Sequence, residues 1–364
     1  RGRTHLLAHA DVGQRRAQGR QHDEARARLP EAAYDYFAGG AGDERTLAEN
    51  VEAWAHVWLR PRHGRGLASA DPGVELLGAR MAAPIVLAPA AAQGLLHPDG
   101  ERAVARAAAA AGLVLCLSTR ATTDLADVAA EAPAAARWFQ LYMDPDEGRV
   151  RRVLERAAEH GYTQVVLTVD LPVPGRRERE RRHGRLALPP GVTLATHLGV
   201  PDEDEDKPLV GGWQAPSWDD VARVREACGL PVAVKGVLTA EDALAAEQAG
   251  ASAVIVSNHG GRQLDGVIPT AVALREVAEA LGGRLPLLVD GGVRSGGDVV
   301  RALSLGADAV LLGRPYLWAL AAGGQAGVEA ALAALVEDTA RTLTLVGAAT
   351  PAEVTAEHTR LRGW

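Results

Sequence analysis

Apolar residues gather along the chain in eight short runs of strand length. The runs cover residues 85–89, 113–118, 138–142, 164–170, 231–236, 253–258, 285–292 and 309–314. Within each run the apolar residues follow one another instead of alternating with polar ones, which is typical of parallel strands covered on both faces. Each run therefore predicts a buried strand of a parallel sheet.

Alanine-rich segments with helical spacing lie between these runs, as at 100–112, 148–161, 240–250 and 296–306. Several of them end in glycine, as helix carboxyl ends often do. Polar residues and glycines follow every strand instead of gathering at one switch point. This favours a closed TIM (β/α)8 barrel, in the α/β class, over an open doubly wound sheet.

Two stretches stand outside the strand–helix repeat. Residues 1–60 predict a helical arm before the first strand, and residues 171–216 form a long connection after the fourth. The connection carries the acidic run DEDED at 202–206, which indicates a solvated, mobile loop. We expect one domain over residues 1–364, with the barrel occupying 61–364.

Composition and charge exclude several classes of protein. The 364 residues are 47% hydrophobic with a net charge of −7, which argues against whole-chain disorder and against a nucleic-acid or anionic-membrane partner. No signal-like segment or run of about 18 apolar residues stands out. The two cysteines, Cys116 and Cys228, suit neither a disulfide framework nor a metal site. We expect a soluble cytoplasmic protein without a metal.

The active site of such a barrel lies at the carboxyl ends of its strands. The densest group of chemically active residues there is SNHGGRQLD, residues 257–265, which begins at the end of the sixth run. Polar, glycine and small residues occupy the same position after the other strands. They are Ala90, Gln93, Ser118, Gln140, Tyr142, Thr168, Asp170, Lys235, Ser257, His259, Arg262, Asp290, Gly291, Gly292, Arg294, Gly313 and Arg314.

Two glycine-rich loops after the last two strands predict a phosphate site. Residues 290–298 read DGGVRSGGD and residues 312–315 read LGRP. Glycine N–H groups, a helix start and an arginine converge on phosphate at these two positions of many barrels. Either segment alone could be a tight turn, but the two together favour phosphate.

These motifs resemble the FMN-dependent α-hydroxy acid oxidase and dehydrogenase family, whose members act on glycolate, lactate or mandelate. Besides 257–265 and the two glycine loops, the likeness runs through residues 34–50, 84–101, 117–122, 138–142, 167–178 and 232–243. The ordered set is far more specific than one glycine pattern. It implies FMN as cofactor and oxidation of an (S)-2-hydroxy acid to the 2-oxo acid.

The resemblance assigns the cofactor residues to two groups. The phosphate group is Asp290, Gly291, Gly292, Arg294, Gly313 and Arg314, and the group near the flavin ring and its chain is Ala90, Ser118, Gln140, Thr168, Lys235 and Ser257. Lys235 suits this role physically, because a cation beside the ring stabilises the anion formed on reduction.

The resemblance also implies the catalytic and substrate residues. His259 is the expected base and Asp170 the carboxylate that orients it. Arg177 and Arg262 are expected to grip the substrate carboxylate, because a guanidinium fork bonds both oxygens. Alternative interpretations are a helix-capping histidine at 259 and, for Arg177, a solvated charged segment at 175–185.

Tyr36 and Tyr142 match two tyrosines that hydrogen-bond the substrate in the family, whereas the neighbouring Tyr34 is expected to pack. Tyr36 reaches the site only if the amino-terminal arm folds over the barrel mouth.

The chain departs from the family members that oxidise glycolate, which carry a tryptophan where this chain has Arg120. Small residues at Ala90 and Ala92 predict a wider pocket and a bulkier acid, such as a mandelate-like one. Arg120 either meets a polar group of that acid or points to solvent. Ala91 matches the alanine that several oxidases of the family carry near the flavin, where some dehydrogenases have glycine, and this resemblance favours O2 as acceptor. A dehydrogenase using a quinone or another acceptor, or an FMN-barrel isomerase, is the alternative, and the resemblance implies a homotetramer.

Overall fold

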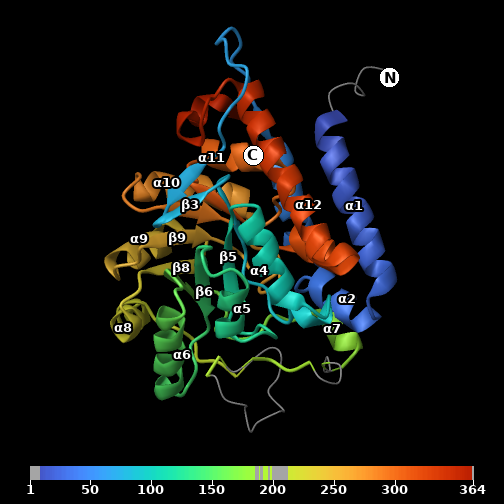
Figure 1. Ribbon diagram of the computed structural model, residues 1–364. Helices are drawn as coiled ribbons and strands as arrows, with labels where there is room; N and C mark the ends of the chain where they lie inside the picture. Colours follow the sequence, from blue (N-terminus) through green and yellow to red (C-terminus); the bar gives the residue numbers. More distant parts are fainter. Residues whose placement is uncertain (1–8, 185–187, 189–191, 196, 199–211, 363–364) are drawn as a thin grey trace.

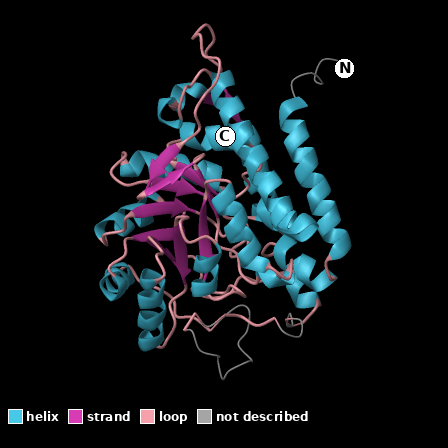
Figure 2. Cartoon of the chain, in the orientation of Figure 1, coloured by secondary structure: helices cyan, strands magenta, loops and turns pink. Residues whose placement is uncertain are grey.

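A closed barrel of eight parallel strands forms the centre of the computed structural model, which describes residues 9–184, 188, 192–195, 197–198 and 212–362 (Figures 1 and 2). Around the barrel each strand pairs with the next, and β10 closes the ring by pairing with both β9 and β11. The strands are β4 (Ile85–Leu87), β5 (Val114–Ser118), β6 (Arg137–Leu141), β7 (Gln164–Thr168), β8 (Val232–Val237), β9 (Ala253–Val256), β10 (Leu287–Val289) and β11 (Ala309–Leu312). Each overlaps one predicted run, so the predicted barrel is confirmed.

A helix follows every barrel strand and covers its outer face. These helices are α4 (Gly100–Ala110), α5 (Leu125–Glu131), α6 (Glu147–Glu159), α8 (Asp219–Cys228), α9 (Ala240–Gln248), α10 (Thr270–Leu281), α11 (Gly296–Ser304) and α12 (Arg314–Val346). The four alanine-rich segments named above coincide with α4, α6, α9 and α11. Their apolar faces pack against the strands, as amphipathic helices of a barrel must.

The helical stretch Arg314–Glu353 is long and apolar enough to cross a membrane by length and composition alone. This corrects the expectation that no such run exists. In the fold, α12 packs against α1, α4 and α11, and it bends at Gly324, whose φ is 58°. Packing on several sides explains the apolar composition as that of a core helix.

The amino-terminal arm is helical, as predicted. It contains α1 (His9–Arg28), α2 (Glu31–Ala38), α3 (Arg45–Ala53) and a 3-10 turn at Trp54–His56. Helix α1 lies beside α12 (Figure 1). Further along, the arm crosses the carboxyl end of the barrel, where Ala41 N–H donates to Gly261 O at 2.8 Å.

Two small antiparallel sheets were not predicted from the sequence. Strand β1 (Val57–Leu59) pairs with β12 (Thr359–Leu361), and β2 (Val74–Leu76) pairs with β3 (Ala79–Met81). Strands this short carry too little periodicity to be recognised. The second pair has a clear place in the fold, because Ala79 and Met81 pack on the inward side chains of the barrel. Short 3-10 turns lie at Gln93–Leu95, Pro351–Glu353 and Ala356–His358.

Side chains of the barrel strands alternate between the interior and the helices. The inward apolar residues include Val86, Cys116, Trp138, Val166, Ala233, Ile255, Leu288 and Leu311. Because side chains repeat with a period of two, the next inward position on each strand lies two residues further toward the carboxyl end. Those positions are Ala88, Ser118, Gln140, Thr168, Lys235, Ser257, Asp290 and Gly313, which we call the floor of the site.

The long connection after β7 is described in part. It holds a short helix, α7 (Glu178–Arg182), which packs against α2. The acidic run 202–206 lies outside the described residues.

Candidate active site

A cavity opens at the carboxyl ends of the strands and encloses about 1110 Å³ of space not filled by atoms, its open mouth included. Six of the floor residues line it: Ala88, Ser118, Thr168, Lys235, Asp290 and Gly313. Loop and arm residues, which we call the rim, line the remainder. They include Tyr36, Arg120, Tyr142, Arg177, Trp213, His259 and Arg262, while Arg294 and Arg314 line a separate part that we call the cationic end. Elements far apart in sequence thus converge on one cavity of ligand size.

Lys235 is the charged centre of the floor. Its Nζ lies 2.9 Å from Asp290 Oδ2 and donates to Ser257 Oγ at 2.7 Å. Burial alone would lower the pKa of Lys235, but the carboxylates of Asp290 and Asp170 raise it above its ordinary value. The lysine is therefore held as a cation. The other oxygen of Asp290, Oδ1, is buried with no hydrogen-bond partner among the described residues.

Gln140 and Ser257 lie behind the cavity wall instead of on it. Gln140 accepts from Ser118 Oγ at 3.2 Å and donates to Thr168 Oγ1 at 3.1 Å, while Ser257 accepts from Lys235. We expected both to touch the cofactor, but neither is among the residues that line the cavity. Here they orient the floor residues that do face it.

A bulge in β8 makes room for Asp170. The pairing of β8 with β9 shifts register between Lys235 and Val237, and Gly236 has a φ of 115°. A Cβ on Gly236 would lie 2.6 Å from the Cβ of Asp170. Only glycine fits this conformation and this gap.

Asp170 follows β7 and His259 follows β9. The two form a hydrogen-bonded pair, with His259 Nδ1 3.0 Å from Asp170 Oδ1. His259 has a φ of 57°, and its backbone N–H donates to Ser257 Oγ at 3.1 Å. This left-handed conformation is uncommon outside glycine and marks a constrained position.

Burial and charge act in opposite directions on this pair. Burial lowers the pKa of His259, and the carboxylate of Asp170 opposes that effect only in part. Burial raises the pKa of Asp170, but His259 and Lys235 outweigh it and leave the pKa below its ordinary value. An ionised carboxylate therefore holds an imidazole that is neutral near physiological pH.

Arg177 and Arg262 lie side by side on the rim. Arg177 Nε donates to Arg262 O at 3.0 Å and its Nη2 donates to Gln263 Oε1 at 3.2 Å. Arg262 donates to the carbonyls of Tyr36 and Gly39 in the arm, and its guanidinium lies 5.0 Å from the centre of the Tyr36 ring. With 5% of its side chain exposed, Arg177 is not part of a solvated charged segment.

A second group of cations lies where β10 and β11 end. Arg314 donates to the carbonyls of Phe37, Gly39 and Gly260, each at 3.0 Å. Burial, with Arg262 and Arg294 nearby, lowers the pKa of Arg314 to about 9. A buried cation with cationic neighbours is stabilised by an anion.

The glycines of this end leave room for that anion. A Cβ on Gly313 would meet no atom within 4 Å, so its backbone borders open space. Gly292 is required for another reason: a Cβ there would lie 1.8 Å from the carbonyl oxygen of Asn50 in α3. One glycine thus opens the cavity, and the other lets the arm dock.

Aromatic side chains close the opposite side of the cavity. Tyr142 stacks on Trp213 with ring centres 5.0 Å apart and planes at 23°. Arg120 lines the cavity with its guanidinium 5.6 Å from the centre of the Trp213 ring, which favours its pocket-facing alternative. Sequence reasoning missed Trp213, although a tryptophan within the polar connection at 171–216 was a usable signal.

Other positions refine the predicted pocket. Ala90 and Ala91 line it, whereas Ala92 is fully buried and absent from the wall, which corrects its expected place. Tyr34 packs on Trp318, as expected of a structural neighbour. Sequence reasoning also missed the apolar wall residues, which carry no distinctive pattern: Phe37, Leu171, Val293, Leu311 and Leu317.

The segment 257–265 docks the arm as well as furnishing the site. Asn258 and Asn50 each donate to the other's side-chain oxygen, at 2.9 and 2.8 Å. Asp265 accepts from the backbone N–H groups of Asp43 and Thr46, both at 2.9 Å. The density of polar residues after β9 therefore serves two purposes, chemistry and attachment of the rim.

Known proteins resemble this chain along most of its length. Residues 25–361 match the family model described as FMN-dependent dehydrogenase. Glycolate oxidase 1 of Oryza sativa subsp. indica is 43% identical over 343 residues, 92% of each chain. L-lactate oxidase of Nostoc sp. (strain PCC 7120) is 41% identical over 336 residues, 89% of this chain and 92% of that protein.

Solved structures of mandelate oxidase share the fold. A mandelate oxidase variant with (S)-mandelic acid gives a TM-score of 0.87 at 41% identity, covering 95% of this chain and 99% of that one. Mandelate oxidase with benzoyl-formic acid gives 0.86 at 40% identity, covering 95% and 98%.

Proposed function

The chain belongs to the FMN-dependent dehydrogenase family, and from this premise we propose that it oxidises an (S)-2-hydroxy acid larger than glycolate to the 2-oxo acid, with O2 as acceptor and H2O2 as second product. FMN-dependent oxidation of a 2-hydroxy acid is the function its glycolate and lactate oxidase relatives share. One observation carries the proposed chemistry of this chain. An imidazole held by a carboxylate faces the same cavity as two adjacent guanidinium groups.

The floor and the cationic end together fit FMN in charge and in shape. Lys235 would offer a buried cation to the flavin ring, and Asp290 Oδ1, which has no hydrogen-bond partner among the described residues, would accept from a hydroxyl of its chain. Arg314, Arg294 and the open backbone of Gly313 suit the phosphate. When bound, FMN supplies the two-electron acceptor of the oxidation.

His259 is the proposed base. Because Nδ1 is engaged by Asp170, the nitrogen left to take a proton from the substrate is Nε2. The lowered pKa keeps this nitrogen unprotonated near neutral pH. Asp170 then stabilises the imidazolium that forms. Oxidation to the 2-oxo acid removes two electrons and two protons from the substrate. One proton comes from the hydroxyl group and the other from C2, and His259 accepts one of them.

Arg177 and Arg262 are the proposed clamp for the substrate carboxylate. Both are nearly buried, so a carboxylate between them would form charge-assisted hydrogen bonds with little competition from water. Burial raises the pKa values of Tyr36 and Tyr142, which keeps both phenols protonated and able to donate. Such a clamp fixes the hydroxyl-bearing carbon relative to His259.

The substrate side chain is proposed to be bulky. Ala90 and Ala91 leave space on one wall, and Trp213 presents an aromatic surface on another. The mandelate oxidase structures contain aromatic acids, (S)-mandelic and benzoyl-formic acid. Arg120, beside Trp213, would suit a polar substituent on that side chain.

Anaerobic reduction of the flavin tests this proposal. The purified protein should show a flavin spectrum that aromatic (S)-2-hydroxy acids bleach at lower concentration than glycolate does. Re-admitted air should restore the colour with one H2O2 formed per turnover. Bleaching by no acid of a broad panel would reject the substrate class. Reoxidation by quinones but not by air would favour the dehydrogenase alternative.

We also propose that the enzyme is a cytoplasmic homotetramer. The family resemblance supports the assembly, and the two free cysteines, Cys116 and Cys228, suit a reducing compartment. Light scattering on the eluting protein would give the mass of the assembly, and a monomeric mass would reject the tetramer.

A further inference from the structure

One carboxylate joins the two rim arginines from outside the cavity. Glu180 Oε1 accepts from Arg177 Nη1 at 3.3 Å and from Arg262 Nη2 at 3.2 Å. Both arginines line the cavity, whereas Glu180 is not among the residues that do. The carboxylate therefore sits behind the arginines, on the side away from the substrate.

The two arginines need such a counter-charge. Their side chains are only 5% and 14% exposed, and burial together with Arg177 lowers the pKa of Arg262. Two adjacent buried cations repel each other, and a shared carboxylate oxygen offsets that repulsion. Because the oxygen bonds one terminal nitrogen of each fork, it also fixes the spacing between the forks.

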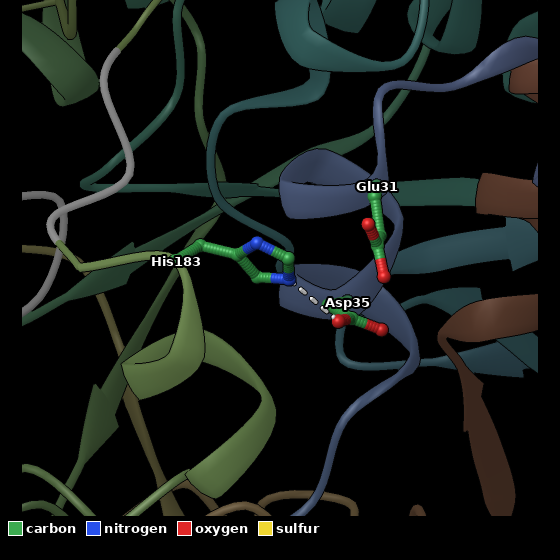
Figure 3. Close-up of side chains that lie close together, drawn as sticks. All are labelled: Glu31, Asp35 and His183. Atoms are coloured by element: carbon green, nitrogen blue, oxygen red, sulfur yellow. Dashed lines mark hydrogen bonds and ion pairs between the residues drawn. The ribbon is translucent and has the colours of Figure 1, made fainter.

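The short helix α7 that carries Glu180 is fastened to the arm. Arg179 Nη2 donates to Glu44 Oε2, and His183 Nε2 lies 2.7 Å from Asp35 Oδ2 of α2 (Figure 3). Glu31, Asp35 and His183 lie close enough together to hold a metal ion. However, Arg179 Nη1 is 4.0 Å from the other Asp35 oxygen, so the site already has a cation. This group is better explained as the fastening of α7, which holds Glu180 in place.

We propose that Glu180 is the positioning residue that sets the spacing and orientation of the Arg177–Arg262 clamp, an inference that rests on the proposed role of these arginines as carboxylate ligands. Glu180 acts through the arginines and does not touch the substrate. Without its charge the guanidinium groups move apart, and the clamp loses its fit to one carboxylate. That geometric loss outweighs any gain from removing a negative charge near the substrate, because both arginines screen Glu180 from the cavity.

The test compares E180Q, E180D and the matched control E178Q in the FMN-loaded enzyme. Glu178 lies in the same helix, but its side chain is 41% exposed and its partners are Arg176 and Arg181. E180Q should raise KM for the 2-hydroxy acid about 10-fold or more with kcat within about twofold, because the lost interaction is uniform binding. E180D should recover part of the loss, and E178Q should match wild type.

Two further measurements separate positioning from general damage. The amide of the same 2-hydroxy acid lacks the carboxylate, so its KM should not respond to E180Q. Benzoylformate binding, followed by the change in flavin absorbance, should weaken about 10-fold in E180Q whether or not turnover occurs. This second readout keeps the inference separate from the proposed function. If the wild-type enzyme is inactive but binds benzoylformate, and E180Q binds it less tightly, the proposed function is refuted and the role of Glu180 stands.

Three outcomes would overturn the inference. One is an E180Q KM equal to that of E178Q or lower than that of wild type. Another is an equal rise in KM for the acid and its amide, which indicates a purely structural role. The third is benzoylformate binding that is undetectable in wild type or unchanged in E180Q.

Discussion

The floor and the rim of the cavity are built in different ways. Floor residues stand at successive ends of the barrel strands, and their inward direction follows from the period of two along each strand. Rim residues come from the arm and from the connections after β5, β6, β7 and β9, and hydrogen bonds between these segments hold several of them. The floor is thus as rigid as the barrel, whereas the rim depends on the docking of its segments. Cofactor binding and substrate chemistry should therefore be separable by mutation.

The largest expected effect on the rim is that of His259→Ala. General base catalysis typically contributes about 10²–10⁴-fold to a rate. Anaerobic flavin reduction by the substrate should therefore slow by about three orders of magnitude. FMN should stay bound, because the floor is untouched. Stopped-flow absorbance measures the rate, and the flavin spectrum reports the bound cofactor.

His160→Ala is the control, since this histidine is exposed at the end of α6. A His259→Ala enzyme reduced at the wild-type rate would show that another group takes the proton. Loss of FMN from the same variant would contradict the separation of floor from rim.

The converse prediction concerns the cationic end of the cavity, where we propose that the phosphate binds. Arg314→Met removes a buried guanidinium from an anion site, and charge-assisted hydrogen bonds of this kind contribute roughly 1.5–3 kcal/mol. FMN affinity should fall about 10- to 100-fold, whereas riboflavin, which lacks the phosphate, should bind as tightly as to wild type. Fluorescence titration of the apoprotein measures both.

The exposed Arg341 supplies the control, because its ion-pair partner among the described residues is the equally exposed Glu337 on the surface of α12. Arg341→Met should leave both affinities unchanged. An equal loss of riboflavin and FMN affinity in Arg314→Met would mean that the arginine supports the arm through the carbonyls of Phe37 and Gly39 and does not bind phosphate.

The same contrast decides what could be predicted from the sequence. Continuous apolar runs located all eight barrel strands, and the barrel then placed Ser118, Thr168, Lys235 and Asp290 at one end without further information. Local pattern and a general property of the fold were sufficient for the floor, since each residue is positioned by its own strand.

Rim contacts were not predictable in this way. Arg262 meets the carbonyls of Tyr36 and Gly39 across more than 220 positions of sequence, and no local periodicity reports such a contact. Family resemblance supplied Tyr36 and Arg177, but neither Trp213 nor Glu180. Both of these lie in the connection after β7, where contacts with other segments hold Trp213 and where the five-residue helix α7 that carries Glu180 is too short to show a helical period in the sequence.

A smaller effect is expected for Asp170→Asn. Asp170 connects the floor with the rim, because it interacts with the charge of Lys235 and hydrogen-bonds His259. Burial lowers the pKa of His259 and Asp170 raises it, so loss of the carboxylate charge should lower it further. The base works when neutral. Therefore kcat/KM is constant above this pKa and falls as the pH drops through it, and the acid limb should move to lower pH in the variant.

The plateau rate should also fall about 10- to 100-fold, because the imidazolium formed on proton transfer loses its counter-charge. A pH series of kcat/KM for wild type and Asp170→Asn measures both effects. An acid limb that moves to higher pH would show that Asp170 does not stabilise the protonated histidine.

The smallest effect separates two tyrosines two residues apart in α2. Tyr36 lines the cavity with its ring against Arg262, whereas Tyr34 packs on Trp318 and bonds His22 Nε2 at 2.8 Å through its hydroxyl. Tyr36→Phe removes one neutral donor, worth about 0.5–1.5 kcal/mol, so KM for the 2-hydroxy acid should rise roughly 2- to 10-fold. Tyr34→Phe removes a hydrogen bond of similar strength from the packing of the arm. It should lower the melting temperature slightly and leave KM unchanged. Equal changes in KM would show that the arm acts on the substrate only through its docking, and the phenol of Tyr36 would then have no direct part in recognition.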